Sequence, residues 1–159
     1  MYEVSLAICP MHPTLYTKVF YEIRNSCREF LHDNREFSLE ETAEFLKENY
    51  KKYFVCQDAY TEDFIGYFRT SDWNLFTHQP TMSIGMDMHE VYRGLGYAKP
   101  LYYMFFIFLR DNFKIHTVYL EVLESNKVAF QLYQDLGFQI QDEREVPGRG
   151  RSFKMYRSL

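Results

Sequence analysis

Short β-rich runs alternate with segments of helical periodicity along the first half of the chain. Residues 2–9 alternate and are rich in strand formers, so they predict a first strand, which two prolines terminate. Apolar residues then recur at helical intervals over residues 15–31 and predict a helix. Ser38 and Glu41 form a capping box, which predicts that a second helix opens there and reaches about Tyr50.

The middle of the chain has the pattern of strands. Residues 53–57 and 64–70 are β-rich runs joined by a polar turn, so they predict a hairpin. Residues 81–88 predict a further strand, after a connecting loop. Gly85 lies inside this strand, where we expect a bulge or a close approach of another backbone segment.

A long helix opens the second half of the chain, over residues 96–113 with Pro100 in its first turn. Its apolar residues run all round, so we expect burial on most faces. The last elements are a strand, a helix and a hairpin: 116–122, 126–136, and 138–145 with 152–157. The order β-α-α-β-β-β-α-β-α-β-β predicts an α/β fold around one largely antiparallel sheet.

Length and charge limit the classes of protein that this chain can belong to. The 159 residues fit one domain, residues 1–159, which can bury roughly 70% of the unfolded surface. A formal net charge of −4 argues against a nucleic-acid or anionic-membrane surface and mildly favours a cationic amine substrate. We therefore expect neither nucleic acid nor membrane as a partner.

Cysteine usage and hydropathy predict a cytoplasmic protein. Cys9, Cys27 and Cys56 are odd in number and widely spaced, which is typical of reduced thiols. The longest wholly apolar run, residues 101–109, is about half of what a bilayer span needs, and Glu3 is unlike the start of a signal peptide. The five histidines show no metal-ligand spacing, so no metal site is expected.

A glycine-containing turn separates the strand at 81–88 from the long helix. Arg93, Gly96 and Ala98 have the spacing Arg-x-x-Gly-x-Ala. Glycines let backbone N–H groups point at a ligand, and a helix start favours negative charge, so a pyrophosphate would fit. A turn that merely starts a helix has the same spacing. The segment matches neither a Walker loop nor a Rossmann fingerprint.

A second stretch gives this turn a context. It comprises Leu120-Glu121-Val122, Ser125-Asn126, Ala129, Leu132-Tyr133 and Gly137-Phe138. Together the two motifs resemble the GNAT superfamily of N-acetyltransferases, and are nearest to its ribosomal-protein alanine and amino-sugar enzymes. Glu90, where many members have Pro, and the bulky Tyr97 depart from the family pattern without removing an amide donor. The resemblance implies a single GNAT-like domain with a mixed, mostly antiparallel central sheet flanked by helices.

The resemblance also implies acetyl-CoA as co-substrate. In the family this loop cradles the pyrophosphate with its backbone, which assigns Arg93, Gly94, Leu95, Gly96, Tyr97 and Ala98. Met86 and Met88 are assigned for their backbone, because the family's fourth strand pairs with the cofactor and offers an N–H to the thioester oxygen. Asn126 is assigned to the pantetheine arm, although capping a helix alone would explain it.

Two side chains are the favoured candidates for proton transfer, and a third is the alternative base. The phenol of Tyr133 can protonate a leaving thiolate, although its place on an apolar helical face also suits a core residue. Glu121 matches a family glutamate that deprotonates the amine, and the alternatives are an exposed strand residue or a structural ion pair. His89 is the second candidate base.

The expected reaction is therefore direct acetyl transfer to a primary amine in a ternary complex. A small molecule such as an amino-sugar is the favoured acceptor, since Arg24 and Asn25 resemble residues of amino-sugar and aminoglycoside enzymes. A protein N-terminus, or a non-catalytic acyl-CoA-binding regulator on the same fold, are the alternatives. Four arginines of the last hairpin could meet an acceptor phosphate or form a solvated face: Arg144, Arg149, Arg151 and Arg157. The sequence is compatible with a homodimer.

Overall fold

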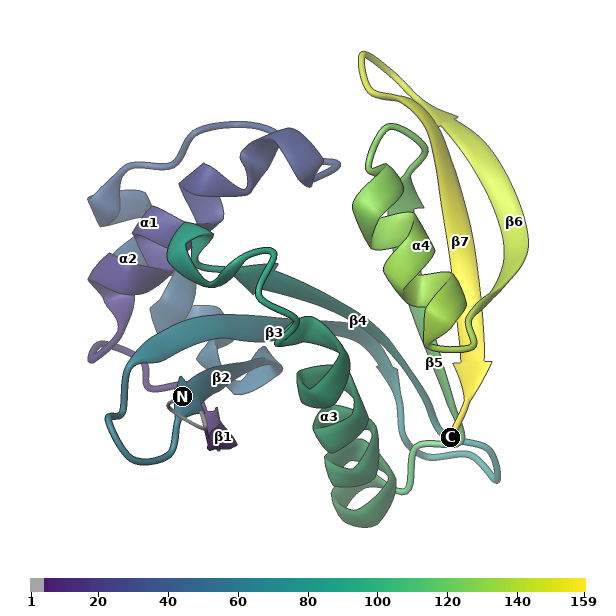
Figure 1. The fold of residues 1–159 in the computed structure, drawn as a ribbon, viewed down its shortest axis with the longest axis horizontal. Coiled ribbons are helices and arrows are strands. Elements are labelled where there is room, and N and C mark those ends of the chain that lie inside the picture. The colour runs from purple at the N-terminus through teal and green to yellow at the C-terminus, as the bar shows by residue number, and fades with distance from the viewer. Residues whose placement is uncertain (1–4) are drawn as a thin grey trace. The chain divides into compact units, whose positions relative to one another are not determined.

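The structure is a computed structural model that describes residues 5–159. Its strands and helices follow one another in the predicted order (Figure 1). The strands are β1 (Leu6–Pro10), β2 (Tyr53–Asp58), β3 (Phe64–Asn74), β4 (Thr81–Met88), β5 (Thr117–Leu123), β6 (Gln139–Val146) and β7 (Gly150–Ser158). The α-helices are α1 (Thr17–Ser26), α2 (Leu39–Asn49), α3 (Ala98–Phe113) and α4 (Lys127–Asp135). Residues 2–4 of the predicted first strand lie outside the described residues.

The strands form one seven-stranded sheet in the order β1-β2-β3-β4-β5-β7-β6. The β1–β2, β2–β3, β5–β7 and β6–β7 pairs are antiparallel. The β4–β5 pair is parallel, with Thr81 beside Thr117. A parallel pair needs a long crossover, which α3 supplies. The prediction of an α/β fold with a mixed, mostly antiparallel sheet is confirmed.

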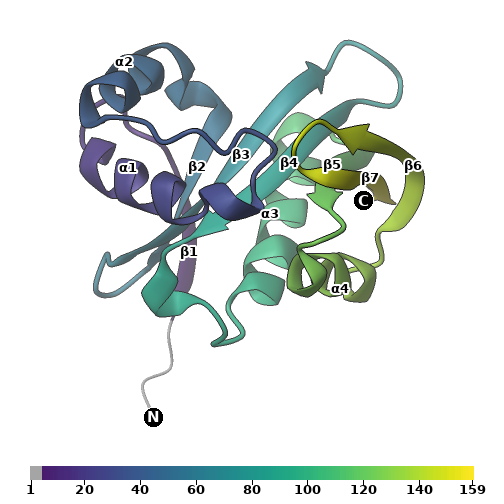
Figure 2. The same cartoon turned by 90° about the horizontal axis from the view of Figure 1, so that it is seen from above.

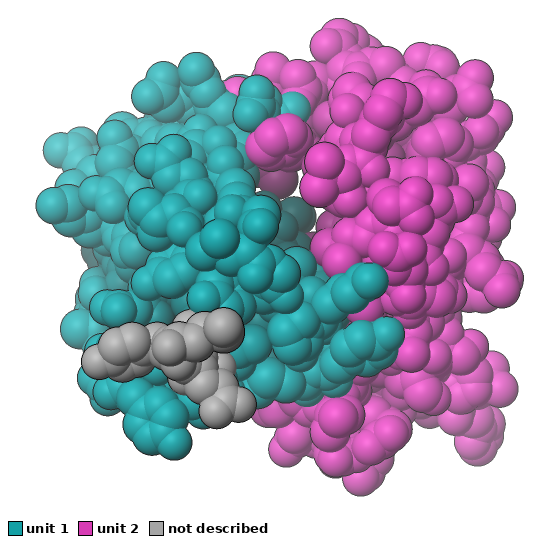
Figure 3. All heavy atoms as spheres, viewed as in Figure 1, with its two compact units in different colours: residues 1–29, 35–69, 86–104 teal, residues 30–34, 70–85, 105–159 magenta. Residues whose placement is uncertain are grey.

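The chain divides into two compact units, coloured in Figure 3. Unit 1 comprises residues 1–29, 35–69 and 86–104, and unit 2 comprises residues 30–34, 70–85 and 105–159. Strands β3 and β4 and helix α3 each supply residues to both units. The assignment of residues 1–159 to a single domain stays a prediction.

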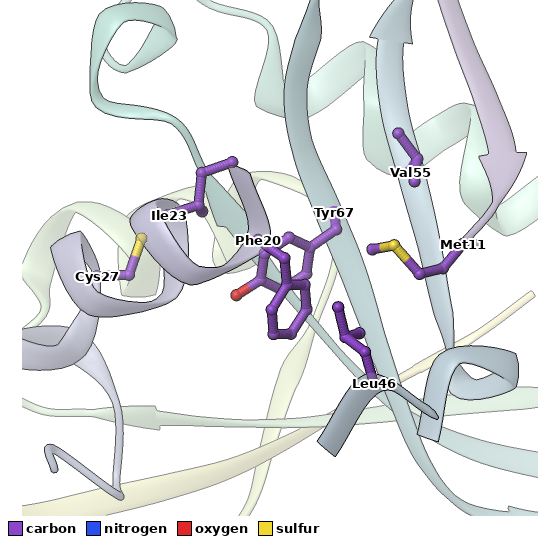
Figure 4. Packing of buried hydrophobic residues seen from close by; sticks show 7 residues of the cluster. All are labelled: Met11, Phe20, Ile23, Cys27, Leu46, Val55 and Tyr67. Carbon is purple, nitrogen blue, oxygen red and sulfur yellow. The ribbon is translucent and has the colours of Figure 1, made fainter. Parts of the chain in front are cut away.

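Aromatic side chains join α1 and α2 to strands β2 and β3 in unit 1. The ring of Phe20 on α1 stacks on Tyr67 of β3 at 4.4 Å and meets Tyr53 of β2 edge-on at 5.2 Å. Phe45 of α2 also packs against Tyr53, at 5.8 Å. Figure 2 shows the two helices side by side. The buried cluster between helices and strands, drawn in Figure 4, consists of Met11, Phe20, Ile23, Cys27, Leu46, Val55 and Tyr67.

Helix α3 begins on the opposite face of β3. Phe68 follows Tyr67 along the strand, and successive side chains of a strand point to opposite faces. Phe68 meets Tyr102 of α3 edge-on at 5.0 Å, whereas Tyr67 meets α1. The central strands are therefore covered on both faces, which explains why Tyr67 and Phe68 are both fully buried.

Unit 2 packs α4 and the second half of α3 against the last strands. Phe130 of α4 contacts Phe153 of β7 at 5.3 Å. Phe106 of α3 contacts Phe138 at 6.0 Å and lies under the guanidinium group of Arg157 at 4.5 Å. These contacts pack α4 and the second half of α3 against side chains of β7.

Three predictions about the elements need correction. Helix α1 ends at Ser26 and a 3-10 turn follows, rather than one helix running through residues 15–31. Strand β3 continues to Asn74, four exposed residues beyond the predicted end. Helix α3 is not buried on most faces, because Tyr103 is 46% and Ile107 is 52% exposed. Within residues 5–159, no helix is long and apolar enough to cross a membrane.

Candidate active site

The predicted phosphate loop lies between a 3-10 turn at Glu90–Tyr92 and the start of α3. Gly94 and Gly96 have φ values of 72° and 85°, in the left-handed region that favours glycine. A Cβ at either position would meet no atom within 4 Å, so the surface of the loop is open. Backbone N–H groups of an open turn before a helix are suited to an anion, and the binding of a pyrophosphate by this loop stays a prediction.

The side chain of Arg93 points into unit 1. Its Nε donates to the carbonyl of Met88 at 2.9 Å, and one terminal nitrogen donates to Ser26 Oγ at 2.8 Å and to Cys27 Sγ at 3.0 Å. The guanidinium group thus joins the loop to the end of β4 and to the end of α1. The backbone N–H of Arg93 donates to the Glu90 carbonyl at 3.2 Å, so the assignment of Arg93 to the pyrophosphate stays a prediction.

Met86 and Met88 lie half-buried at the end of β4. The Met88 carbonyl also receives a hydrogen bond from Cys27 Sγ, at 3.7 Å. Burial, with a smaller contribution from Asp87, raises the pKa of the Cys27 thiol, so this thiol stays protonated and can donate. The carbonyl that precedes the loop is therefore held by two side chains.

The candidate acid lies in the second half of α4. Tyr133 is 8% exposed, and its ring meets Phe138 edge-on at 5.8 Å. Asn126 caps the same helix, where its Oδ1 accepts from the N–H of Ala129 at 3.3 Å. Capping thus uses the single side-chain oxygen of the residue that was assigned to the pantetheine arm.

The candidate base lies on β5 and has an arginine partner. Both oxygens of Glu121 lie 3.4 Å from nitrogens of Arg144 on β6. The Glu121 side chain is 42% exposed, and Lys154 lies beside it on β7. The arrangement contains the structural ion pair that was the alternative to catalysis.

The second candidate base, His89, is held by local bonds. The imidazole Nδ1 accepts from the backbone N–H of Val91 at 3.3 Å, and the backbone N–H of His89 donates to the carbonyl of Ile65 at 2.8 Å. The imidazole also meets the ring of Tyr92 at 6.2 Å. His89 thereby terminates β4 and starts the 3-10 turn.

The predicted site residues divide between the two units. The loop, Met86, Met88 and His89 belong to unit 1. Glu121, Asn126 and Tyr133 belong to unit 2. No cluster of three or more metal-ligating side chains occurs in the part of the chain that the structure describes.

Sequence reasoning missed a polar set inside unit 1. Arg69 of β3 donates to both oxygens of Asp87 on β4, at 3.0 and 3.3 Å. Asp87 is 3% exposed, and beside it the fully buried hydroxyl of Tyr67 lacks a hydrogen bond of good geometry among the described residues. Burial raises the pKa of the Tyr67 phenol, and the negative charge of the nearby Asp87 carboxylate raises it further. The sequence did contain a signal for this pair, because each of two largely apolar strands carries one charged residue at these positions.

Comparisons with known proteins agree with this architecture. The family profile of the Acetyltransferase (GNAT) family matches residues 17–138. A spermidine N-acetyltransferase from Vibrio cholerae, solved with CoA and spermine, has the same fold, with a TM-score of 0.85 at 19% identity over 96% of this chain and 95% of that one. A GNAT-family acetyltransferase from Bacillus anthracis gives a TM-score of 0.81 at 14% identity over 98% and 96%.

No protein of curated function matches this sequence significantly. The structural likenesses show the fold, and the family profile covers most of the chain. The resemblance seen in the two motifs is thereby confirmed. The chain belongs to the GNAT family of acetyltransferases, which use acetyl-CoA as their co-substrate.

Proposed function

We propose that the protein transfers the acetyl group of acetyl-CoA to a primary amine of a small molecule, by direct attack in a ternary complex. Acetyl-CoA supplies an acetyl group activated as a thioester. The observation that carries the proposal is the open loop with Gly94 and Gly96 at positive φ before a 16-residue helix. Its geometry suits the pyrophosphate of the acyl donor.

The proposed chemistry assigns one proton to each candidate side chain. Glu121 takes the proton of the acceptor amine, directly or through water, as the nitrogen forms its bond to the acetyl carbon. Tyr133 gives its phenolic proton to the sulfur as the carbon–sulfur bond breaks. The backbone N–H groups at Met86 and Met88 stabilise the negative charge on the acetyl oxygen. Asn126 assists with the pantetheine arm.

The favoured acceptor is an amino-sugar. The motif resemblance supports it, and the Vibrio cholerae neighbour, which is a spermidine acetyltransferase, supports the wider class of small amines. A protein N-terminus and a regulator without catalysis remain the alternatives.

Gly96→Val tests the assignment of the loop. A β-branched side chain at a φ of 85° strains the turn and covers its amides, so we expect acetyl-CoA to bind at least about tenfold more weakly in titration calorimetry. Gly148→Val is the matched control, since Gly148 has a φ of 73°, is equally open and lies in the β6–β7 turn. Unchanged affinity in a folded Gly96→Val protein would remove the loop from the donor site.

A further inference from the structure

Hydrogen bonds join the end of α1 to the turn at residues 93–98, here called the donor loop. The Arg93 side chain donates from Nε to the Met88 carbonyl at 2.9 Å, and a terminal nitrogen donates to Ser26 Oγ at 2.8 Å and to Cys27 Sγ at 3.0 Å. The Cys27 thiol also donates to the Met88 carbonyl, at 3.7 Å. Arg93, Met88 and Cys27 thus form a closed ring of three hydrogen bonds.

The two acceptors of the guanidinium group, Ser26 and Cys27, are themselves fixed by α1. Ser26 Oγ donates to the Ile23 carbonyl at 2.9 Å, and the backbone N–H of Cys27 donates to the same carbonyl at 3.0 Å. Ile23 is 1% exposed, and Phe20 nearby on the helix stacks on Tyr67 of β3 at 4.4 Å. Both acceptors therefore belong to the firmly packed end of a helix.

The end of α1 also suits the positive charge of Arg93. Ser26 is the last residue of the helix, and the carboxyl end of a helix carries a partial negative charge that stabilises a nearby cation. Hydrogen bonds from a charged donor are stronger than those between neutral groups. Charge as well as geometry therefore holds the Arg93 side chain at this end of the helix.

The donor loop depends on its two ends for its shape. At the far end the Tyr97 carbonyl accepts from the N–H of Leu101 at 3.2 Å, within the first turn of α3. Between Tyr97 and Arg93 lie Gly94 and Gly96, both with positive φ and open surroundings. Glycine adopts more backbone conformations than any other residue, so loosening the anchor at Arg93 would let the loop leave the conformation that suits an anion.

We infer that Ser26 and Cys27 are positioning residues of the donor site, which hold the donor loop in shape through Arg93 and thereby increase the affinity for acetyl-CoA. A loop that is already in its binding conformation loses less conformational freedom when the ligand binds. The inference rests on the proposed function and adds the end of α1 to the residues that determine donor binding. Ser26 and Cys27 take no part in proton transfer.

Ser26→Ala and Cys27→Ala test the inference. Each change removes one acceptor of the Arg93 side chain, so we expect each to weaken acetyl-CoA binding by about three- to tenfold in titration calorimetry. Cys27→Ser keeps a group that can donate and accept, and it should therefore retain most of the affinity. The titrations use acetyl-CoA alone and do not depend on the identity of the acceptor.

Cys56→Ala is the matched control for Cys27→Ala. Both cysteines are buried in unit 1, but Cys56 lies on β2 opposite Ile8 of β1. Loss of its thiol should lower the melting temperature and leave the affinity for acetyl-CoA within about twofold of the parent's. Melting curves verify that each variant is folded.

A double-mutant cycle tests whether the effect passes through Arg93. Arg93→Met keeps an unbranched side chain and removes its N–H donors, so it should weaken acetyl-CoA binding at least as much as Ser26→Ala does. Ser26→Ala added to Arg93→Met should then cause little further loss, since residues of one hydrogen-bond network are not additive. Full additivity of the two losses would exclude Arg93 as the connection and overturn the inference.

The outcomes separate this inference from the proposed function. Parental affinity in folded Ser26→Ala and Cys27→Ala proteins would overturn the inference, although the parent protein still binds acetyl-CoA and acetylates amines. An equal loss of affinity in Cys56→Ala would overturn it as well, because any buried thiol would then have the same effect. Failure of the parent protein to bind acetyl-CoA would overturn the proposed function first.

Discussion

At the scale of the single residue, the surroundings of Glu121 and of Tyr133 each fit two interpretations. One is a structural role, and the other is a role in proton transfer. Glu121 has Arg144 at 3.4 Å from both oxygens, as a structural ion pair would. Tyr133 is 8% exposed against Phe138, as a core tyrosine would be. Substitutions that retain shape separate the two interpretations, because packing then stays nearly the same and only the group that gives or takes the proton is lost.

Tyr133→Phe retains the ring and removes the hydroxyl. If the phenol protonates the leaving sulfur, kcat should fall by about 10²-fold while acetyl-CoA affinity changes only a few-fold, since the group acts in the transition state. The measurement is turnover under conditions where acyl transfer limits the rate. Full turnover, with a stability change of about 1 kcal/mol, would identify Tyr133 as a core residue only.

Glu121→Gln and Arg144→Gln disrupt the same ion pair from its two ends. An exposed ion pair contributes about 0–1 kcal/mol to the free energy of unfolding. If the pair is purely structural, both variants should therefore lower the free energy of unfolding by a similar, small amount. A base at Glu121 predicts that Glu121→Gln alone lowers kcat/KM by about 10²-fold, with the loss shrinking as pH approaches the pKa of the amine. Steady-state kinetics across pH distinguishes the structural pair from the base. If both variants keep the pH–rate profile of the parent, His89 is favoured as the base.

The buried phenols of Tyr53 and Tyr67 predict that the protein becomes less stable at alkaline pH. Burial raises the pKa of Tyr53 to about 12 and that of Tyr67 well above its ordinary value. The native state binds these protons more tightly than the unfolded state, so the stabilisation is complete below pH 10 and is lost as pH rises toward 12. We expect the free energy of unfolding to fall by about 1.4 kcal/mol per pH unit for each phenol in that range.

Urea denaturation at a series of pH values measures this slope. Tyr53→Phe should reduce it by the contribution of one group. A slope equal to that of the parent would show that Tyr53 does not carry the effect.

At the scale of elements, the backbone of β4 leaves no room for a side chain at Gly66 of β3. A Cβ at Gly66 would collide with the carbonyl oxygen of Asp87 and lie 3.0 Å from the Met88 Cα. Both are backbone atoms and cannot rotate away. The close approach was expected at Gly85, and for that glycine it stays a prediction.

Gly66→Ala should therefore destabilise the protein by about 1–3 kcal/mol, as overpacking does. The change also displaces Asp87 and Met88, so we expect weaker acetyl-CoA binding in addition to a lower melting temperature. Ser71→Ala, on the exposed end of the same strand, is the control. A melting temperature equal to the parent's would show that β4 moves aside without cost.

Local patterns determine the elements that sequence can predict. Alternation located β4 and β5 within one residue, and the Ser38 capping box located the start of α2, with Glu41 N–H donating to Ser38 Oγ at 3.1 Å. The contacts of Arg93 with Ser26 and Cys27 could not be predicted, because they join residues more than sixty positions apart. Which face of α3 is exposed likewise depends on the elements that pack against the helix. The periodicity of the sequence does not identify those elements.

At the scale of the whole molecule, three elements run through both compact units. Strands β3 and β4 and helix α3 each change unit along their length. A helix or strand that melts in one half exposes the backbone of its other half, so the stabilities of the two units are connected through the chain itself.

We accordingly expect a single unfolding transition. Scanning calorimetry should give a calorimetric enthalpy equal to the van't Hoff enthalpy, as for one cooperative domain. The same measurement tests the assignment of residues 1–159 to one domain. Two resolved transitions would instead indicate that each unit folds independently.

The contacts of Arg93 alter what its place in a family signature means. The Nε of Arg93 donates to the Met88 carbonyl at 2.9 Å, and a terminal nitrogen donates to Ser26 and Cys27. These hydrogen bonds hold the turn in place and need no ligand. A relative that had lost its ligand could therefore keep this arginine for folding alone, so an arginine at this position does not by itself indicate a bound cofactor.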